Sequence, residues 1–252
     1  MNYLYDETFE GFLTCVYNHY YFNRAIGIFP ERDYQVDLLN DYEVVITDEE
    51  KASIVYNAIS DKISHYDLGR VYKVFRTCEK EKEIKLLRYI IMGFKKGSKI
   101  RFLHGHPIVA DVLNAERRLG LEIQRLYGLI RFSSVSDGAN SVPIMYASIE
   151  PDNDLLEFLA SHFIDRFKNE PFIIHDVTRE KALVAYRKEW TISEFHDSEL
   201  LSNTREEEEY QNLWRRYFDI IAIKERKNSR LQKNYMPARY WKHLTEITAD
   251  KS

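Results

Sequence analysis

The chain has 252 residues, of which 44% are hydrophobic and 30% are charged, and its net charge is −4. This composition excludes a chain that is disordered over most of its length, because disorder requires low hydrophobicity and high net charge. Cys15 and Cys78 are the only cysteines. Two thiols are too few for a disulfide scaffold, a four-cysteine zinc site or a self-contained iron–sulfur cluster. We find neither a membrane-length apolar run nor a secretory signal pattern, so we expect a cytoplasmic protein.

Residues 1–105 are predicted to form a mainly helical region. A short strand at Tyr3–Tyr5 precedes a helix that Thr8 starts, and β-branched residues predict a second strand at Tyr42–Thr47. Asp48 starts the next helix. Two further helices are predicted at residues 67–77 and 80–96. The second of them ends at Gly97, a natural helix cap.

Residues 106–252 are predicted to form a second region, so that the whole chain belongs to the α+β class. A helix over residues 107–126 leads into four strands that flank one further helix, which ends near residue 168. The strands are Gly128–Ser136, Ile144–Glu150, Phe172–Thr178 and Lys181–Tyr186. This order predicts a small antiparallel sheet with a helix on one face. An amphipathic helix follows at residues 205–223, with Tyr210, Leu213 and Trp214 on its apolar stripe.

No strong catalytic motif is present, and we predict neither a metal site nor a cofactor. The helix before residue 168 places His162 and Arg166 on one face, and Asp176 lies on the next strand. A histidine, an arginine and a carboxylate near one sheet are candidates for a catalytic pocket. The alternative is a structural network of ion pairs and hydrogen bonds, and this is the interpretation that we favour.

The most basic part of the sequence is residues 224–243, which carry seven basic side chains and one acidic one, a net charge of +6. Such a segment has the side chains that bind nucleic acid: cations for phosphates, amides for hydrogen bonds and aromatic rings for stacking. The candidate contacts are Arg226, Asn228, Arg230, Lys233, Arg239, Tyr240, Trp241 and Lys242. The alternative is a solvated basic segment whose aromatic rings pack onto the domain.

Several strings of the sequence resemble a bacterial family of DNA repair or DNA metabolism proteins that carry a domain of unknown function. They include Gly128–Phe132, Tyr146–Pro151, the pattern His162-Phe163-x-x-Arg166-Phe167, and Ile174–Asp176. The longest runs from Arg226-x-Asn228-x-Arg230 to Met236-Pro237-x-Arg239-Tyr240-Trp241-Lys242-His243. The resemblance covers about residue 88 onward, and the N-terminal portion is also similar.

The resemblance implies a partner rather than a reaction. Members are encoded beside a radical S-adenosylmethionine (radical SAM) protein, and in some of them a similar region is joined to a uracil-DNA-glycosylase-like domain. The family has no agreed catalytic residues, so neither glycosylase activity nor iron–sulfur chemistry is carried over to this chain.

Three hypotheses follow from the sequence. The first is a DNA-binding accessory protein of a repair system, which works with a radical SAM or uracil-DNA-glycosylase-type protein. The second is an enzyme that acts on DNA through His162, Arg166 and Asp176. The third is an adaptor that binds a protein partner without contacting DNA.

Overall fold

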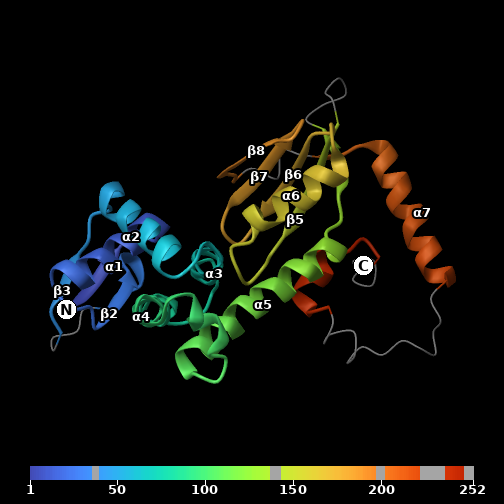
Figure 1. Ribbon diagram of the computed structural model, residues 1–252. Helices are drawn as coiled ribbons and strands as arrows, with labels where there is room; N and C mark the ends of the chain where they lie inside the picture. The colour runs from blue at the N-terminus through green and yellow to red at the C-terminus, as the bar shows by residue number, and fades with distance from the viewer. Residues whose placement is uncertain (36–39, 137–142, 197–201, 222–235, 247–252) are drawn as a thin grey trace. The chain divides into compact units, whose positions relative to one another are not determined.

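A computed structural model divides the chain into two compact units, Met1–Gly120 and Leu121–Ser252, and the boundary between them in the sequence falls within helix α5 (Pro107–Leu129). Figure 1 shows the course of the chain. The sequence placed this division near residue 105, at the start of that helix rather than inside it. The structure describes residues 1–35, 40–136, 143–196, 202–221 and 236–246.

The N-terminal unit combines four helices with a small parallel sheet (Figure 1). Its strands are β1 (Asn2–Tyr5), β2 (Gly27–Pro30) and β3 (Tyr42–Val44), and the central β1 pairs in parallel with both neighbours. The helices are α1 (Phe9–Tyr21), α2 (Glu49–Lys62), α3 (His65–Phe75) and α4 (Lys82–Lys96). Single 3₁₀ turns occur at η1 (Glu31–Asp33) and η2 (Gly97–Phe102). The mainly helical character was predicted, whereas β2 was not.

The predicted helix ends of this unit have a local physical basis. Thr8 Oγ1 accepts a hydrogen bond from the Gly11 N–H at 2.9 Å, and Asp48 accepts from the N–H groups of Glu50 and Lys51, each at 3.1 Å. Both side chains satisfy donors that the first helical turn leaves unpaired. Gly97 ends α4 with a φ of +61°, a conformation that disfavours residues with a Cβ.

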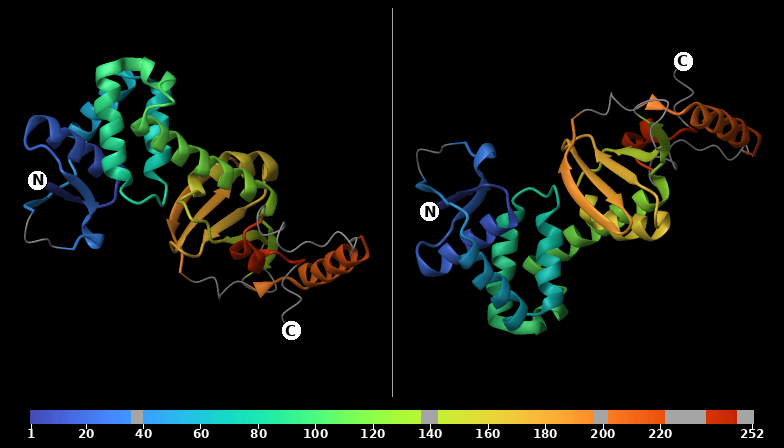
Figure 2. Two further views of the ribbon diagram at one scale, coloured as in Figure 1. Left: turned by 90° about the horizontal axis from the view of Figure 1, so that it is seen from below. Right: turned by 90° about the horizontal axis from the view of Figure 1, so that it is seen from above.

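The C-terminal unit is built on one mixed sheet with the strand order β8-β7-β6-β5-β4-β9. The strands are β4 (Ser133–Ser136), β5 (Ile144–Ile149), β6 (Phe172–Asp176), β7 (Lys181–Tyr186), β8 (Glu189–Glu194) and β9 (Ser202–Asn203). Helix α6 (Leu156–Phe167) lies against one face of this sheet, as Figures 1 and 2 show. Helix α7 (Arg205–Ile221) and the 3₁₀ segment η5 (Ala238–His243) complete the unit.

The α+β class and the helix on one face are confirmed, but the prediction of a purely antiparallel sheet is wrong in one place. Strands β5 and β6 pair in parallel, with Ala147 opposite Ile174. The reason is that α6 connects them as a crossover, which returns the chain to the end of the sheet where β5 began. The β4–β5 and β6–β7 pairs are antiparallel, as predicted. The two strands that were not predicted, β8 and β9, also pair antiparallel with their neighbours.

The two faces of this sheet differ in character. Ala147, Ile174 and Leu183 are paired across β5, β6 and β7, are at most 1% exposed and lie on the α6 side. The Phe172 ring on that side lies 5.2 Å from the ring of Phe167 in α6. Because side chains alternate along a strand, Ser148 and its cross-strand partner His175 project to the opposite face, where η5 lies. The sheet therefore has an apolar face under α6 and a polar face beside η5.

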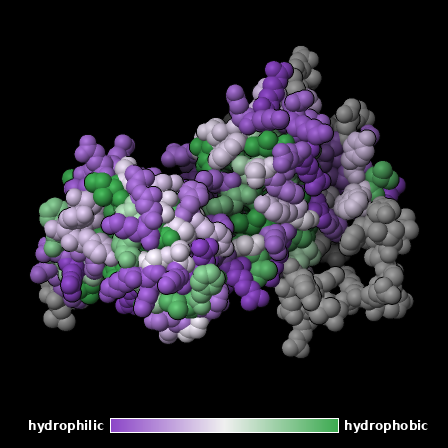
Figure 3. All heavy atoms as spheres, in the orientation of Figure 1, coloured by the Kyte–Doolittle hydropathy of each residue, from purple (hydrophilic) through white to green (hydrophobic). Residues whose placement is uncertain are grey.

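Hydrophilic side chains cover most of the face drawn in Figure 3, interspersed with smaller hydrophobic patches. Among the described helices, none has both the length and the apolar composition that crossing a membrane requires.

A buried ionic network is expected to dominate the stability of the N-terminal unit. Asp67 is 0% exposed, and it accepts hydrogen bonds from Arg70 Nη1 at 2.8 Å and from the Tyr89 hydroxyl at 2.7 Å. Removing one member of a buried pair leaves an uncompensated charge, so we expect Asp67→Ala to lower the free energy of unfolding by about 3 kcal/mol in urea titrations. The matched control is Lys73→Ala, which breaks an exposed ion pair with Glu116 and should cost less than about 1 kcal/mol. Equal losses for the two variants would contradict this account.

Candidate functional site

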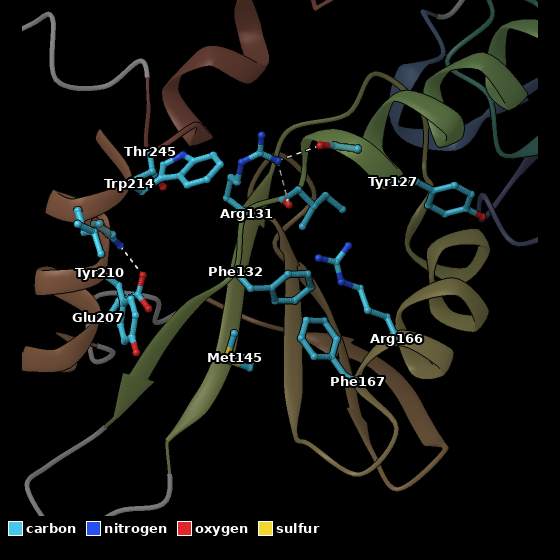
Figure 4. A pocket seen from close by; sticks show the side chains of 14 residues that line it. Tyr127, Arg131, Phe132, Met145, Arg166, Phe167, Glu207, Tyr210, Trp214 and Thr245 are labelled. Carbon is cyan, nitrogen blue, oxygen red and sulfur yellow. Dashed lines mark hydrogen bonds between the residues drawn. The ribbon is translucent and has the colours of Figure 1, made fainter. Parts of the chain in front are cut away.

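The C-terminal unit contains a cavity of about 990 Å³ between α7, the end of α6 and the segment that enters β4. Figure 4 shows the side chains that surround it. Aromatic rings from four parts of the unit line it: Tyr127 from α5, Phe132 before β4, Phe167 from α6, and Tyr210 and Trp214 from α7. A cavity of this size with several aromatic walls can accept a planar ring such as a nucleobase.

Helix α7 presents its apolar stripe to this cavity instead of burying it in a core. The side chains of Tyr210, Leu213 and Trp214 are 70%, 63% and 43% exposed. Polar contacts hold the helix in place: Glu207 accepts a hydrogen bond from the Ser134 N–H at 3.1 Å, and Gln211 donates to Ser133 Oγ at 3.1 Å. The amphipathic stripe predicted from the sequence is therefore real, and its apolar surface remains open to a ligand.

Two arginines, Arg131 and Arg166, line the cavity together with Glu207. Arg131 forms an ion pair with Glu246 at 2.8 Å, and the indole N–H of Trp214 donates to the same carboxylate at 3.3 Å. Burial alone would raise the pKa of Glu246, but the hydrogen bond from Arg131 holds it below its ordinary value. Arg166 also lines the cavity and is exposed, and no carboxylate in the described part of the chain pairs with it. The guanidinium of Arg166 is thus available to an anionic ligand.

The three predicted catalytic residues do not come together. His162 stacks on Tyr127 with ring centroids 4.0 Å apart, and so lies beside the cavity that Arg166 lines. Asp176 is 0% exposed and accepts hydrogen bonds from the Thr178 N–H at 3.1 Å and from Arg179 Nη1 at 2.8 Å. Burial raises the pKa of Asp176, against the pull of Arg179. Its contacts stabilise the turn between β6 and β7, and no described contact joins it to His162 or Arg166.

The described part of the basic segment is anchored to the domain. Arg239 pairs with Asp152 at 2.6 Å and with Glu122 at 3.2 Å, and Lys242 pairs with Glu150. These carboxylates already compensate the two cations that were predicted to bind phosphate.

The two aromatic residues of the segment are anchored as well. Tyr240 is only 2% exposed, which conflicts with its predicted stacking on a base, and the Trp241 indole donates to the Met236 carbonyl at 2.9 Å. The remaining predicted contacts, Arg226, Asn228, Arg230 and Lys233, lie outside the described residues.

The carboxylate of Glu122 in α5 organises this anchoring. It is 3% exposed and accepts hydrogen bonds from the Tyr240 hydroxyl at 2.6 Å and from the backbone N–H of Asp152 at 2.8 Å. The side-chain amide of Asn153 donates to it at 2.5 Å. Burial alone would raise the pKa of Glu122, but these hydrogen bonds hold it below its ordinary value. Helix α5, the loop before α6 and η5 are thereby joined at one point.

Two histidines on the polar face of the sheet bond to hydroxyl groups of β5. His175 Nδ1 lies 2.8 Å from the Tyr146 hydroxyl, and His243 Nδ1 lies 2.9 Å from Ser148 Oγ. Burial lowers the pKa of both imidazoles. Sequence reasoning did not select Ser148 or His243 as site residues, because their 95-residue separation hides the contact. Among the described residues, no group of three or more histidines, cysteines, aspartates or glutamates is placed to hold a metal ion.

The C-terminal unit is therefore an α+β domain whose mixed sheet carries a helix on one face and an aromatic cavity at its β4 end. A family model described as a domain of unknown function, DUF4130, matches residues 80–246. The chain belongs to this family, because the match covers well over half of its length. The comparisons with curated proteins and with solved structures found no match.

Replacing the buried carboxylate of Glu122 is expected to destabilise the C-terminal unit. Glu122→Gln removes the negative charge opposite Arg239 and weakens the acceptor of Tyr240, so we expect a loss of about 2–4 kcal/mol in the free energy of unfolding. Asp152→Asn is the control, because it removes a carboxylate that also pairs with Arg239 but is 51% exposed. Similar effects of the two substitutions, measured by urea denaturation, would contradict the central role of Glu122.

The two buried histidines predict a pH dependence of stability. Because their pKa values are lower in the folded state than the ordinary value of about 6.5, the unfolded chain binds more protons below that pH. Their contribution to stability is complete above about pH 7 and is lost as the pH falls through 6.5 towards the lowered values. We expect the free energy of unfolding to fall over this window, and His243→Asn to make the fall shallower. An unchanged slope in the variant would show that His243 does not contribute.

Proposed function

We propose that the protein binds single-stranded DNA, with an unpaired base in the aromatic cavity and the adjoining phosphate on Arg166. The observation that carries the proposal is the guanidinium of Arg166, which pairs with no carboxylate of the described residues and lines the same cavity as the exposed rings of Tyr210 and Trp214. Stacking rings and a cation are the two elements that single-strand binding sites combine. The resemblance to DNA repair and DNA metabolism proteins supports the same ligand.

The biological role that fits this proposal is an accessory protein in DNA repair or DNA metabolism. The resemblance implies a radical SAM protein or a uracil-DNA-glycosylase-like protein as the partner that performs chemistry on the strand. In this role the protein presents an unpaired base, and Arg226, Arg230 and Lys233 extend the phosphate contacts beyond the cavity. Arg239 and Lys242 are excluded from the phosphate contacts, because Glu122, Asp152 and Glu150 already pair with them.

The proposal predicts separate effects for the stacking ring and the cation. Affinity is measured by fluorescence anisotropy with a labelled single strand of about 20 nucleotides, longer than one binding site, at several salt concentrations. We expect Trp214→Ala to weaken binding by about 5–100-fold through lost stacking. We expect Arg166→Ala to weaken binding and to reduce the slope of log affinity against log salt by about one.

Matched controls separate these effects from a general change in charge or stability. Arg187→Ala removes an exposed arginine of the same unit that stacks on Tyr186 away from the cavity, and it should leave affinity nearly unchanged. Arg166→Lys should retain most of the salt dependence. Equal losses for Arg166→Ala and Arg187→Ala, or binding that salt does not weaken, would overturn the proposal.

A triple variant, Arg226→Ala with Arg230→Ala and Lys233→Ala, tests the extended contacts with the anchoring cations left in place. If it leaves DNA binding intact but abolishes co-purification with the partner protein, and DNA does not compete, the basic segment is a protein-docking element as the adaptor hypothesis states.

A further inference from the structure

A second, smaller cavity of about 210 Å³ adjoins the aromatic one. Arg131, Gln211 and Thr245 line both. The smaller cavity is polar, and the side chains that open onto it include Ser148 from β5 together with Lys242 and His243 from η5. The proposed DNA contacts use none of the last three residues.

Ser148, His243 and Glu150 lie in a row beside this cavity, and a hydrogen bond joins the first two. Ser148 Oγ lies 2.9 Å from His243 Nδ1, and His243 Nε2 lies 3.8 Å from Glu150 Oε1. The His243 side chain is 15% exposed, and its Nε2 is buried without a hydrogen-bond partner among the described residues. Strand β5 supplies Ser148, and Glu150 follows at its end on the same side, because residues two apart along a strand share a face.

The order of these three groups suits nucleophilic chemistry. Burial lowers the pKa of His243, so the imidazole is neutral near pH 7 and can accept a proton. When Nδ1 accepts from the Ser148 hydroxyl, the ring proton is on Nε2, which faces the carboxylate of Glu150. A hydroxyl with a base in hydrogen-bond reach is the central part of an activated serine, and Glu150 is a nearby carboxylate that lies beyond hydrogen-bond distance of the base.

The charges around the cavity indicate the substrate class. Arg131 and Lys242 both line it, and Glu150 already pairs with Lys242. The guanidinium of Arg131 keeps N–H donors beyond its ion pair with Glu246, and these favour an electrophile that carries negative charge. A phosphate ester has this charge, whereas a neutral carboxylic ester does not. The cavity also opens beside the site where the proposed DNA strand lies, since Arg131 belongs to both.

We propose that Ser148 is a nucleophile, activated by His243, that attacks a phosphate ester of a strand bound in the aromatic cavity. Ser148 Oγ forms a bond to phosphorus as its proton moves to His243 Nδ1, and the ester P–O bond breaks. The leaving alkoxide takes that proton from His243 and departs as an alcohol. Water then attacks phosphorus, gives a proton to His243, and releases a phosphate-ended product and the serine oxygen, which recovers the proton.

The inference rests on the proposed function only for the identity of the strand. The reactivity of Ser148 is tested without DNA, by treating the full chain with a fluorophosphonate probe and locating the label by mass spectrometry. We expect the label on Ser148, its loss in Ser148→Ala, and labelling at least about 100-fold slower in His243→Asn, since a general base contributes a factor of this size. Ser133→Ala is the matched control, because Ser133 lines the same cavity and bonds to Gln211 instead of a histidine.

Turnover on DNA is tested with the same variants and an end-labelled single strand. We expect slow cleavage and a protein–DNA adduct on Ser148 that survives denaturation, with both absent in Ser148→Ala. That substitution removes one small oxygen, so the folded state should persist, and anisotropy shows whether the variant still binds DNA.

The outcomes separate the two proposals. No label on Ser148, or labelling that His243→Asn leaves unchanged, would overturn the nucleophile while leaving DNA binding intact. A label on Ser148 without DNA binding would overturn the proposed function and the DNA substrate, and leave the activated serine. Hydrolysis of p-nitrophenyl acetate without hydrolysis of bis(p-nitrophenyl) phosphate would overturn the assignment to phosphate esters.

Discussion

The buried carboxylate of Glu122 is the constraint on which the arrangement of the C-terminal unit depends. Removing this charge from water is costly, and hydrogen bonds from Tyr240, Asp152 and Asn153 offset that cost. The bonded groups belong to η5 and to the loop before α6, so one carboxylate fixes both against α5. Two other contacts of the closing segment then follow, namely His243 with Ser148 and Glu246 with Arg131. The segment from η5 to Glu246 supplies part of the wall of both cavities, so these walls depend on the contacts of Glu122.

This constraint also decides how the basic segment is used. By sequence, residues 226–242 carry cations along their whole length and no acidic residue. In the structure Arg239 and Lys242 form ion pairs with carboxylates that are distant in the sequence. Glu122, for example, is 117 residues from Arg239. Local sequence contains no information about such distant partners. The pattern of basic and aromatic residues in this segment was therefore equally consistent with phosphate contacts and with side chains packed onto the domain. The candidate anionic site moves instead to Arg166, which sequence reasoning selected for its helix face and not for its environment.

Local signals predicted most of the fold, and non-local pairing accounts for the rest. Thr8, Asp48 and Gly97 mark helix ends through bonds to residues three or four positions away, so their sequence signals are sufficient. Strands β2, β8 and β9 were missed. Strand β9 has only two residues, and β8 is largely exposed, although Trp190 and Ile192 alternate with polar residues along it. The parallel pairing of β5 with β6 was missed because strand order alone does not show which end of the sheet α6 returns to. Asp176 was expected near His162, but its carboxylate instead accepts hydrogen bonds from Thr178 and Arg179 in the turn between β6 and β7.

The position of Arg131 explains why the two cavities form one continuous site. Its guanidinium is fixed by Glu246 and by the Gly128 carbonyl, each at 2.8 Å, and it lines both cavities. On one side α7 offers the exposed rings of Tyr210 and Trp214, and on the other β5 offers a hydroxyl bonded to the imidazole of His243. In the proposed complex the base lies on the aromatic side with its adjoining phosphate on Arg166, and Ser148 faces a phosphate ester of the same strand on the other side of Arg131.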